Sequence, residues 1–389
     1  MASCSRRLGA VALLAVAALP AAAGCGGGGG DDGGRAATAN RPRLTPAVAR
    51  ALDDALRTKV ADAGIPGASA SVVFPDGRQW RGAAGAAVLE PRRAMTPDTA
   101  LPFDSVTKVL TAALALRLDE LGRLSIQDPI RRWWPAWNGD RGATLEDLLR
   151  HSSGMRDPPP AFFERLDRGG VPVGPATLVR GARRPLPRTG GSEYSNAGFA
   201  LLGLIERRAG GRPVDELARE LLFDHPGGSG LALQPAERPR RPFAHSYWYP
   251  DGLGDPVDVY DGSGLLPARS PATVVASAGA LAGDVPSLAR WAHELLDGRI
   301  LARASLRRMT RFRGGIAFGG YGLGLAREET PGRRTMWGHL GDGWGSHTEL
   351  WHLPGERLTV AVTWNDDVLD REGGILWALL DAALRTDRA

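Results

Sequence analysis

Residues 103–116 read Phe-Asp-Ser-Val-Thr-Lys-Val-Leu-Thr-Ala-Ala-Leu-Ala-Leu, and this stretch decides how the rest of the chain is interpreted. Apolar residues between Val109 and Leu118 fall on every side of the predicted helix, which is typical of a helix buried on all faces. Residues three apart share one helix face, with Cβ atoms about 5–6 Å apart. The sequence therefore predicts that Ser105 and Lys108 are neighbours at the N-terminus of a core helix.

A buried lysine next to a serine suggests a chemical role. A desolvated lysine loses proton affinity and can accept the proton of a serine hydroxyl. Arginine does not deprotonate in proteins, and the chain uses arginine for 46 of its 48 basic residues, with Lys59 and Lys108 as the two lysines. The alternative is a surface lysine in the first turn of a helix, so a second motif is needed.

The second motif is Tyr194-Ser195-Asn196, which precedes an apolar helix over 199–205. A phenol near a lysine can shuttle the proton of the serine, and an asparagine amide can bond both a substrate and the lysine. The alternative is that Tyr194 is a packed ring and Asn196 only caps the helix.

The third motif covers residues 337–345, Trp-Gly-His-Leu-Gly-Asp-Gly-Trp-Gly, between two strand-like runs. Its glycines would let a substrate backbone approach the edge of a strand. His339 on its own is more often a structural histidine than a site residue.

The pattern of elements predicts an α+β fold. Helical spacing begins at Thr45 and ends near Gly64, and a β-hairpin follows over 68–74 and 79–84. Helices are predicted near 105–121, 144–150, 196–209, 213–222, 285–297 and 375–384, and strands near 321–327, 333–338, 346–353 and 358–364. Strands at both ends predict one antiparallel sheet built from the N- and C-terminal segments, flanked by helices, with a mostly helical region inserted between them.

The three motifs, in this order, resemble those of the serine β-lactamase-like hydrolases: D-alanyl-D-alanine carboxypeptidases, class C β-lactamases and their esterase relatives. The resemblance covers roughly residues 45–385 and implies a β-lactamase/transpeptidase-like fold and an acyl-enzyme mechanism. By this resemblance Ser105 is the nucleophile, Lys108 its base and Tyr194 the proton shuttle. Asn196 would contact substrate and lysine, Gly341 would line the site, and the backbone N–H groups of Ser105 and Asp342 would form the oxyanion hole.

The third motif departs from the Lys-Thr-Gly of most β-lactamases. Leu340 lacks the hydroxyl that would bond a substrate carboxylate. The side chain of Asp342 is expected near the place of an anionic substrate, which favours an ester or a neutral amide. If His339 carries a charge that holds an acidic substrate, turnover of anionic substrates should fall as pH rises through about 6.5.

The predicted function is hydrolysis of an amide or ester, with a D-alanyl-D-alanine-type peptidoglycan peptide, a β-lactam and a small carboxylic ester all left open. The alternative is a catalytically silent penicillin-binding-like protein of the cell surface. No cofactor is expected, and no metal, because the zinc-hydrolase pattern H-E-x-x-H does not occur. The pattern G-x-S-x-G is also missing, which argues against the nucleophile elbow of an α/β-hydrolase. The net charge of +5 is too small to indicate a nucleic-acid partner.

The N-terminus predicts export. Residues 1–25 resemble a lipoprotein signal: Arg6-Arg7, an apolar run, and small residues before Cys25, which would carry the lipid. A signal cut near Ala23 without lipid is the alternative, and both Sec and twin-arginine export are open. Residues 26–43 predict a Gly-rich flexible linker and 44–389 the hydrolase domain, anchored through its lipid to the outer face of the bacterial cell membrane.

Overall fold

A computed structural model describes residues 41–159, 161–162, 174–186, 192–240, 242–249, 254–314, 316, 318–368, 370 and 374–385. The predicted signal segment 1–25 and residues 26–40 of the predicted linker lie outside these described residues. Within them, no helix has both the length and the apolar character needed to cross a membrane.

An antiparallel sheet of eight strands forms the centre of the described chain, in the order β3-β2-β1-β13-β12-β11-β10-β9. The N-terminal hairpin pairs with the last strand, with Ala70 opposite Val362, so both ends of the domain meet in the middle of the sheet. The predicted α+β fold is confirmed. The strands are β1 (Gly67–Val73), β2 (Gln79–Val88), β3 (Arg93–Ala94), β9 (Gly320–Tyr321), β10 (Ala326–Glu329), β11 (Thr335–Gly343), β12 (Ser346–Leu353) and β13 (Leu358–Trp364).

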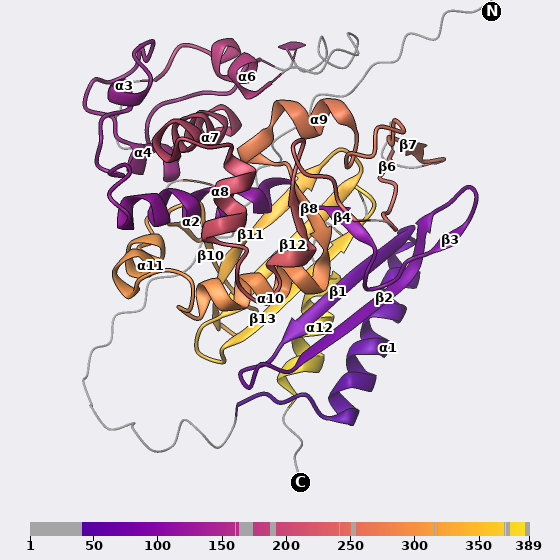
Figure 1. Cartoon of the computed structure of the whole chain (residues 1–389). Coiled ribbons are helices and arrows are strands. Elements are labelled where there is room, and N and C mark those ends of the chain that lie inside the picture. The colour runs from indigo at the N-terminus through magenta and orange to yellow at the C-terminus, as the bar shows by residue number, and fades with distance from the viewer. Residues whose placement is uncertain are drawn as a thin grey trace, which may run out of the picture.

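Two helices, α1 (Pro46–Ala63) and α12 (Gly374–Leu384), cover one face of this sheet (Figure 1). Helix α1 begins where the Thr45 hydroxyl accepts a hydrogen bond from the Val48 N–H, and it ends at Gly64 with φ at 69°. Its buried residues recur every fourth position, as the sequence predicts: Val48, Leu52, Leu56 and Val60. They share one apolar cluster with α12 and the sheet.

The other face carries α10 (Val285–Leu296), α2 (Thr107–Glu120) and the helical region inserted between the two halves of the sheet (Figure 1). That region contains α3 (Ile130–Trp133), α4 (Leu145–Leu149), α6 (Pro175–Gly181), α7 (Asn196–Gly210), α8 (Val214–Leu221) and α9 (Arg269–Val274), and α11 (Arg303–Met309) follows α10. Two smaller sheets, β4-β8-β5 and β6-β7, comprise Ala100–Pro102, Leu281–Asp284, Leu231–Leu233, Tyr247–Trp248 and Val257–Asp258. The remaining 3₁₀ turns are η1 (Asp104–Val106), η2 (Gly228–Gly230) and η3 (Ala276–Ala278).

The structure differs from the predicted elements at the Ser105 turn and in the strands around the third motif. The predicted helix 105–121 starts at Thr107, and Ser105 lies in the 3₁₀ turn η1 that precedes it. The predicted strand 321–327 is two short strands, and β11 continues through the third motif to Gly343. Glycines weaken a local strand signal, so only pairing with β12 reveals this extension.

Candidate active site

The turn that carries Ser105 is held by bonds to two neighbouring strands. The Phe103 N–H donates to the Leu281 carbonyl of β8 at 2.9 Å, and the Leu281 N–H donates to the Thr107 hydroxyl at 2.9 Å. Asp104 has a φ of 46°, in the left-handed region that a non-glycine residue rarely adopts. Its carboxyl accepts a hydrogen bond from the Ser346 hydroxyl of β12 at 2.7 Å. These bonds fix the backbone on both sides of Ser105.

Lys108 is wholly buried, and its amine contacts three oxygen atoms from three segments. The Nζ atom lies 2.9 Å from the Ser105 Oγ, 2.8 Å from the Asn196 Oδ1 and 2.8 Å from the Ala278 carbonyl oxygen. Burial lowers the pKa of the Lys108 amine to about 7, and the carboxylates of Asp157 and Asp104 oppose that shift. At neutral pH a large share of the amine is therefore uncharged.

The same three contacts suit the neutral amine. An uncharged amine has two N–H bonds and one lone pair, whereas the ammonium has three N–H donors. Because Asn196 Oδ1 and the Ala278 carbonyl can only accept, they take the two N–H bonds and leave the lone pair for the Ser105 hydroxyl. Ser105 is partly exposed while Lys108 is buried, so a substrate can reach the hydroxyl but not the amine.

Tyr194 covers this pair. Its ring centroid lies 4.7 Å from the Lys108 Nζ. Burial raises the pKa of the Tyr194 hydroxyl well above its usual range, and a side-chain hydrogen bond with Ser105 opposes part of the shift. The phenol is therefore protonated at neutral pH, which suits a proton donor and leaves the role of base to Lys108.

Two residues that the sequence does not predict as site residues, Asp157 and His151, hold the second motif in place. The Asp157 carboxylate accepts hydrogen bonds from the Ser195 hydroxyl at 3.1 Å, the Asn196 Nδ2 at 2.9 Å and the Ala197 N–H at 2.8 Å. The His151 Nδ1 accepts from the Ser195 N–H at 3.0 Å, and the imidazole packs on the Tyr194 ring with centroids 4.4 Å apart. His151 lies in the stretch 148–154, which also resembles the family, but its contact with the second motif is not visible in the sequence, and the spacing of Asp157 gives no signal of its own.

His339 comes close to the site, but as a neutral histidine. Its ring lies 6.2 Å from that of Tyr194, its Nε2 is 3.0 Å from the Tyr321 hydroxyl, and its Nδ1 bonds to the Leu340 carbonyl. Burial, followed by the positive charge of Lys108, lowers the pKa of His339 to about 3. With this pKa the imidazole is neutral near pH 6.5, so the structure gives no support to the expectation that a charged His339 holds an acidic substrate. The local sequence does not reveal the full burial that causes this shift.

Asp342 lies on the far face of the sheet. It pairs across β11 and β12 with His347, which in turn lies opposite Trp364 in the apolar cluster beneath α1 and α12. Because side chains alternate along a strand, His339 and Gly341 face the Ser105 turn while the Asp342 carboxylate faces away. The expectation that this carboxylate lies beside an anionic substrate is corrected accordingly.

The Asp342 carboxylate forms an ion pair with His347. His347 is buried, and its Nδ1 lies 2.5 Å from the Asp342 Oδ1. Burial favours the neutral imidazole, but hydrogen bonds with Asp342 and Glu349 outweigh it and raise the pKa of His347 to about 10. The resulting cation offsets the charge of Asp342.

Glycines of β11 allow the Ser105 turn to rest directly on the strand. A Cβ atom at Gly341 would lie 2.4 Å from the Phe103 carbonyl oxygen, and one at Gly343 would lie 2.0 Å from the Asp104 Oδ1. Glycine at both positions therefore allows the Ser105 turn to approach β11 closely. The sequence alone suggests a different reason for these glycines, the approach of a substrate backbone.

The structure thus brings Ser105, Lys108, Tyr194 and Asn196 together, with His339 and Gly341 beside them, whereas the side chain of Asp342 lies apart. Within the described part of the chain, no group of three or more His, Cys, Asp or Glu side chains is arranged to hold a metal ion.

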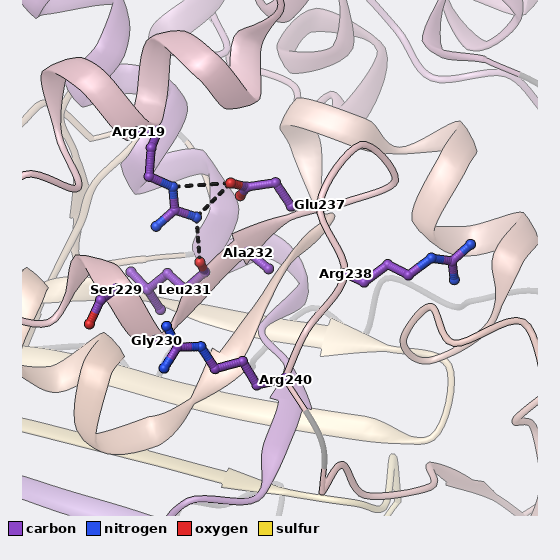
Figure 2. Close-up of a pocket in the computed structure, with 8 residues that line it drawn as sticks. All are labelled: Arg219, Ser229, Gly230, Leu231, Ala232, Glu237, Arg238 and Arg240. Carbon is purple, nitrogen blue, oxygen red and sulfur yellow. Dashed lines mark hydrogen bonds and ion pairs between the residues drawn. The ribbon is translucent and has the colours of Figure 1, made fainter.

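A surface pocket elsewhere is lined by residues of α8, β5 and the segments beside β5, and none of the predicted site residues belongs to it (Figure 2). There the Arg219 guanidinium bonds to the Glu237 carboxylate at 2.6 Å and to the Leu231 carbonyl at 2.8 Å. Its charge is used within the fold, and the Ser105 cluster remains the candidate active site.

Residues 52–385 match the sequence model of the family described as Beta-lactamase. The chain belongs to the Beta-lactamase family. The resemblance on which the three motifs rest is thereby confirmed, and it extends over nearly all of the described residues.

Three similar proteins have names that refer to the D configuration. A D-aminopeptidase of Brucella anthropi is 29% identical over 314 residues, which cover 77% of this chain and 56% of that protein. The chain thus spans little more than half the length of this relative. A D-stereospecific amidohydrolase from Streptomyces sp. is 25% identical, with a TM-score of 0.69 over 85% of this chain and 97% of that one. A D-amino acid amidase from Ochrobactrum anthropi SV3 shares the fold, at 23% identity and a TM-score of 0.75 over 86% and 98% of the two chains.

Replacing Gly341 with alanine should move the Ser105 turn. The new Cβ would lie 2.4 Å from the Phe103 carbonyl, a backbone atom that cannot rotate away. We expect kcat/KM for an ester substrate to fall about tenfold to a hundredfold, because displacing catalytic groups by about 1 Å has effects of this order. Gly355→Ala is the matched control, since a Cβ there meets nothing within 4 Å. Equal activity of the two variants would contradict the close contact.

Proposed function

We propose that this protein hydrolyses small amides of D-amino acids through an acyl-enzyme on Ser105. The observation that carries the proposal is the wholly buried Lys108 amine, 2.9 Å from the Ser105 hydroxyl and with its pKa lowered to about 7. The substrate class is inferred from the names of the similar proteins, a D-aminopeptidase and a D-stereospecific amidohydrolase.

The first step forms the acyl-enzyme. Neutral Lys108 removes the proton of the Ser105 hydroxyl as its oxygen attacks the amide carbonyl carbon, and the carbonyl oxygen becomes an oxyanion. The Ser105 N–H, at a turn leading into α2, is one donor for that oxyanion, and we assign the Asp342 N–H as the second. The side chain of Asp342 has no part in this step.

The second half of acylation breaks the C–N bond. The leaving amine must gain a proton, and the protonated Tyr194 phenol, bonded to Ser105, can donate it. The phenol regains a proton from the Lys108 ammonium, whose Nζ lies 4.7 Å from the ring centroid. A water molecule then attacks the ester carbonyl carbon while Lys108 accepts its proton, and the C–O bond to Ser105 breaks as the Lys108 ammonium, 2.9 Å from the Oγ, returns that proton to the serine and the D-amino acid leaves.

A substrate panel tests the proposal. We expect the amides of D-alanine and D-phenylalanine to be hydrolysed at least ten times more efficiently than the L-amides, a D-Ala-D-Ala peptide, nitrocefin or p-nitrophenyl acetate. Ser105→Ala should abolish turnover and leave the melting temperature unchanged within a few degrees. Intact-mass spectrometry should show a fluorophosphonate adduct on the wild type and none on Ser105→Ala.

Two results would count against the proposal in different ways. A wild type that gains no adduct would favour a silent cell-surface binding protein. An adduct together with preference for the peptide, the β-lactam or the ester would keep acylation of Ser105 and overturn the substrate class.

The pH dependence of acylation tests the role of Lys108. Only the neutral amine is a base, so kcat/KM should fall about tenfold per pH unit below a midpoint near 7. Burial also raises the pKa of Asp104 to about 7, so Asp104→Asn is the control. This variant should keep the ascending limb but show its midpoint at a lower pH, because it loses the negative charge that raises the pKa of Lys108. Disappearance of the limb would assign it to Asp104 instead.

We also propose that the protein is exported and held at the outer face of the cell membrane by a lipid on Cys25. The support is the leader sequence, in which small residues precede Cys25 and a Gly-rich stretch follows it.

Labelling with radioactive palmitate in a bacterial host tests the anchor. The wild type should carry label and sediment with membranes, and Cys25→Ala should lose both properties, because the acylated thiol is absent. An unlabelled wild type whose mature chain begins near Gly24 would show a signal cut without lipid.

A further inference from the structure

Asp157 lies next to the reacting groups without touching Ser105 or Lys108. It sits in the segment after α4, and its backbone is tied down by an isolated bridge between Arg156 and Arg183. The Arg183 Nε also donates to the Asp157 carbonyl at 2.8 Å. The backbone that carries this carboxylate is therefore held by contacts that do not involve Asn196.

Both oxygens of the Asp157 carboxylate accept hydrogen bonds from one short segment, residues 195–197. Oδ1 accepts from the Ser195 hydroxyl at 3.1 Å and from the Ala197 N–H at 2.8 Å, and Oδ2 accepts from the Asn196 Nδ2 at 2.9 Å. Ala197 is in the first turn of the 15-residue helix α7, where the N–H groups lack helical partners and a negative charge is stabilising.

These contacts determine which way the Asn196 amide points. An amide has one acceptor and one donor end, and Asp157 can bond only the donor end. The acceptor Oδ1 must then face the Lys108 Nζ, at 2.8 Å. If the amide turned over, its N–H₂ group would meet the lysine amine and its oxygen would meet the carboxylate, so both contacts would be lost.

We propose that Asp157 is a positioning residue for acylation: it orients the Asn196 amide, which in turn holds the Lys108 amine against the Ser105 hydroxyl. The inference rests on the proposed acylation of Ser105 and adds a residue that acts on the reacting groups without touching them, through the Asn196 amide and through its charge. Asp157 touches neither the nucleophile nor the base in the described contacts.

The charge of Asp157 has a second effect on the lysine. Burial lowers the pKa of Lys108, and the Asp157 carboxylate is the largest influence that opposes the shift. The carboxylate therefore keeps the amine basic enough to take the serine proton. The other titratable groups close to this amine are Asp104, His151, Tyr194 and His339.

Asp157→Asn tests the proposal, because it keeps the shape of the side chain and removes its charge. We expect kcat for an activated ester to fall at least tenfold with little change in KM, and the ascending limb of the pH profile to move below that of the wild type. In an Asn196→Ala background the same substitution should add less than a twofold loss of kcat on the plateau above the ascending limb, because the amide it orients is gone and the Lys108 amine is neutral there with or without the Asp157 charge.

Ser195→Ala is the matched control. It removes another hydrogen bond to Asp157 and the side-chain cap of α7, to which the Gly198 N–H donates at 3.0 Å, but it keeps the bond between Asp157 and Asn196. This variant should unfold more easily than the wild type and yet keep the wild-type pH limb. If Asp157 served only the stability of the fold, Asp157→Asn would likewise unfold more easily and keep the wild-type pH limb.

The outcomes separate the two proposals. If the wild type is acylated at Ser105 and folded Asp157→Asn keeps the wild-type kcat or pH limb, the positioning role is overturned and the proposed function stands. If Asp157→Asn does not fold, Asp157→Glu decides, since it retains the charge and displaces the carboxylate. It should lower kcat and keep the limb, and wild-type kcat would overturn the role. A wild type without an acyl adduct overturns the proposed function itself.

Discussion

The burial of the Lys108 amine is the constraint on which the rest of the site depends. Removing an ammonium group from water costs several kcal/mol unless oxygen atoms replace the lost hydration. The fold supplies three such atoms, from the Ser105 hydroxyl, the Asn196 amide and the Ala278 carbonyl. These atoms belong to three segments far apart in the chain, so the amine is satisfied only when η1, α7 and η3 are assembled around α2. These oxygen atoms do not fully replace the lost hydration of the ammonium, so burial lowers the pKa of Lys108 and makes its amine a base.

The sheet contributes through its alternation. Gly341 and Gly343 of β11 point toward the Ser105 turn and let it rest on the strand, while Asp342 between them points to the other face and pairs with His347. One strand therefore serves two environments. The face toward α2 is shaped for close backbone approach, and the face toward α1 and α12 holds an ion pair next to the apolar core. A substitution at one residue of this motif cannot be judged from its neighbour in sequence.

Tyr194, His151 and His339 share a further property: burial favours the neutral form of all three side chains, by raising the pKa of the phenol and lowering the pKa of the two imidazoles. Around a lysine that must lose its proton, added positive charges would lower its basicity further, and a phenolate would compete as a base. A neutral aromatic environment leaves Lys108 as the group that titrates near 7 beside the nucleophile, with Asp104 on the opposite side of the turn. Asp157 is the charged group that offsets the burial from a distance.

The sequence by itself determined the features that depend on local pattern. The apolar residues on every side of 109–118 predicted a buried helix, and apolar residues at every fourth position predicted α1. Strand-like runs predicted the strands of the sheet. All of these signals are patterns over short stretches of sequence. The pairing of Ser105 with Lys108 followed from helical spacing, although Ser105 lies in a 3₁₀ turn. Only the tertiary structure decided the ionisation of His339, the direction of the Asp342 side chain, and the involvement of His151 and Asp157. The physical reason is that burial, strand pairing and hydrogen bonding join residues distant in the chain, and these contacts leave no trace in the spacing of residues along it.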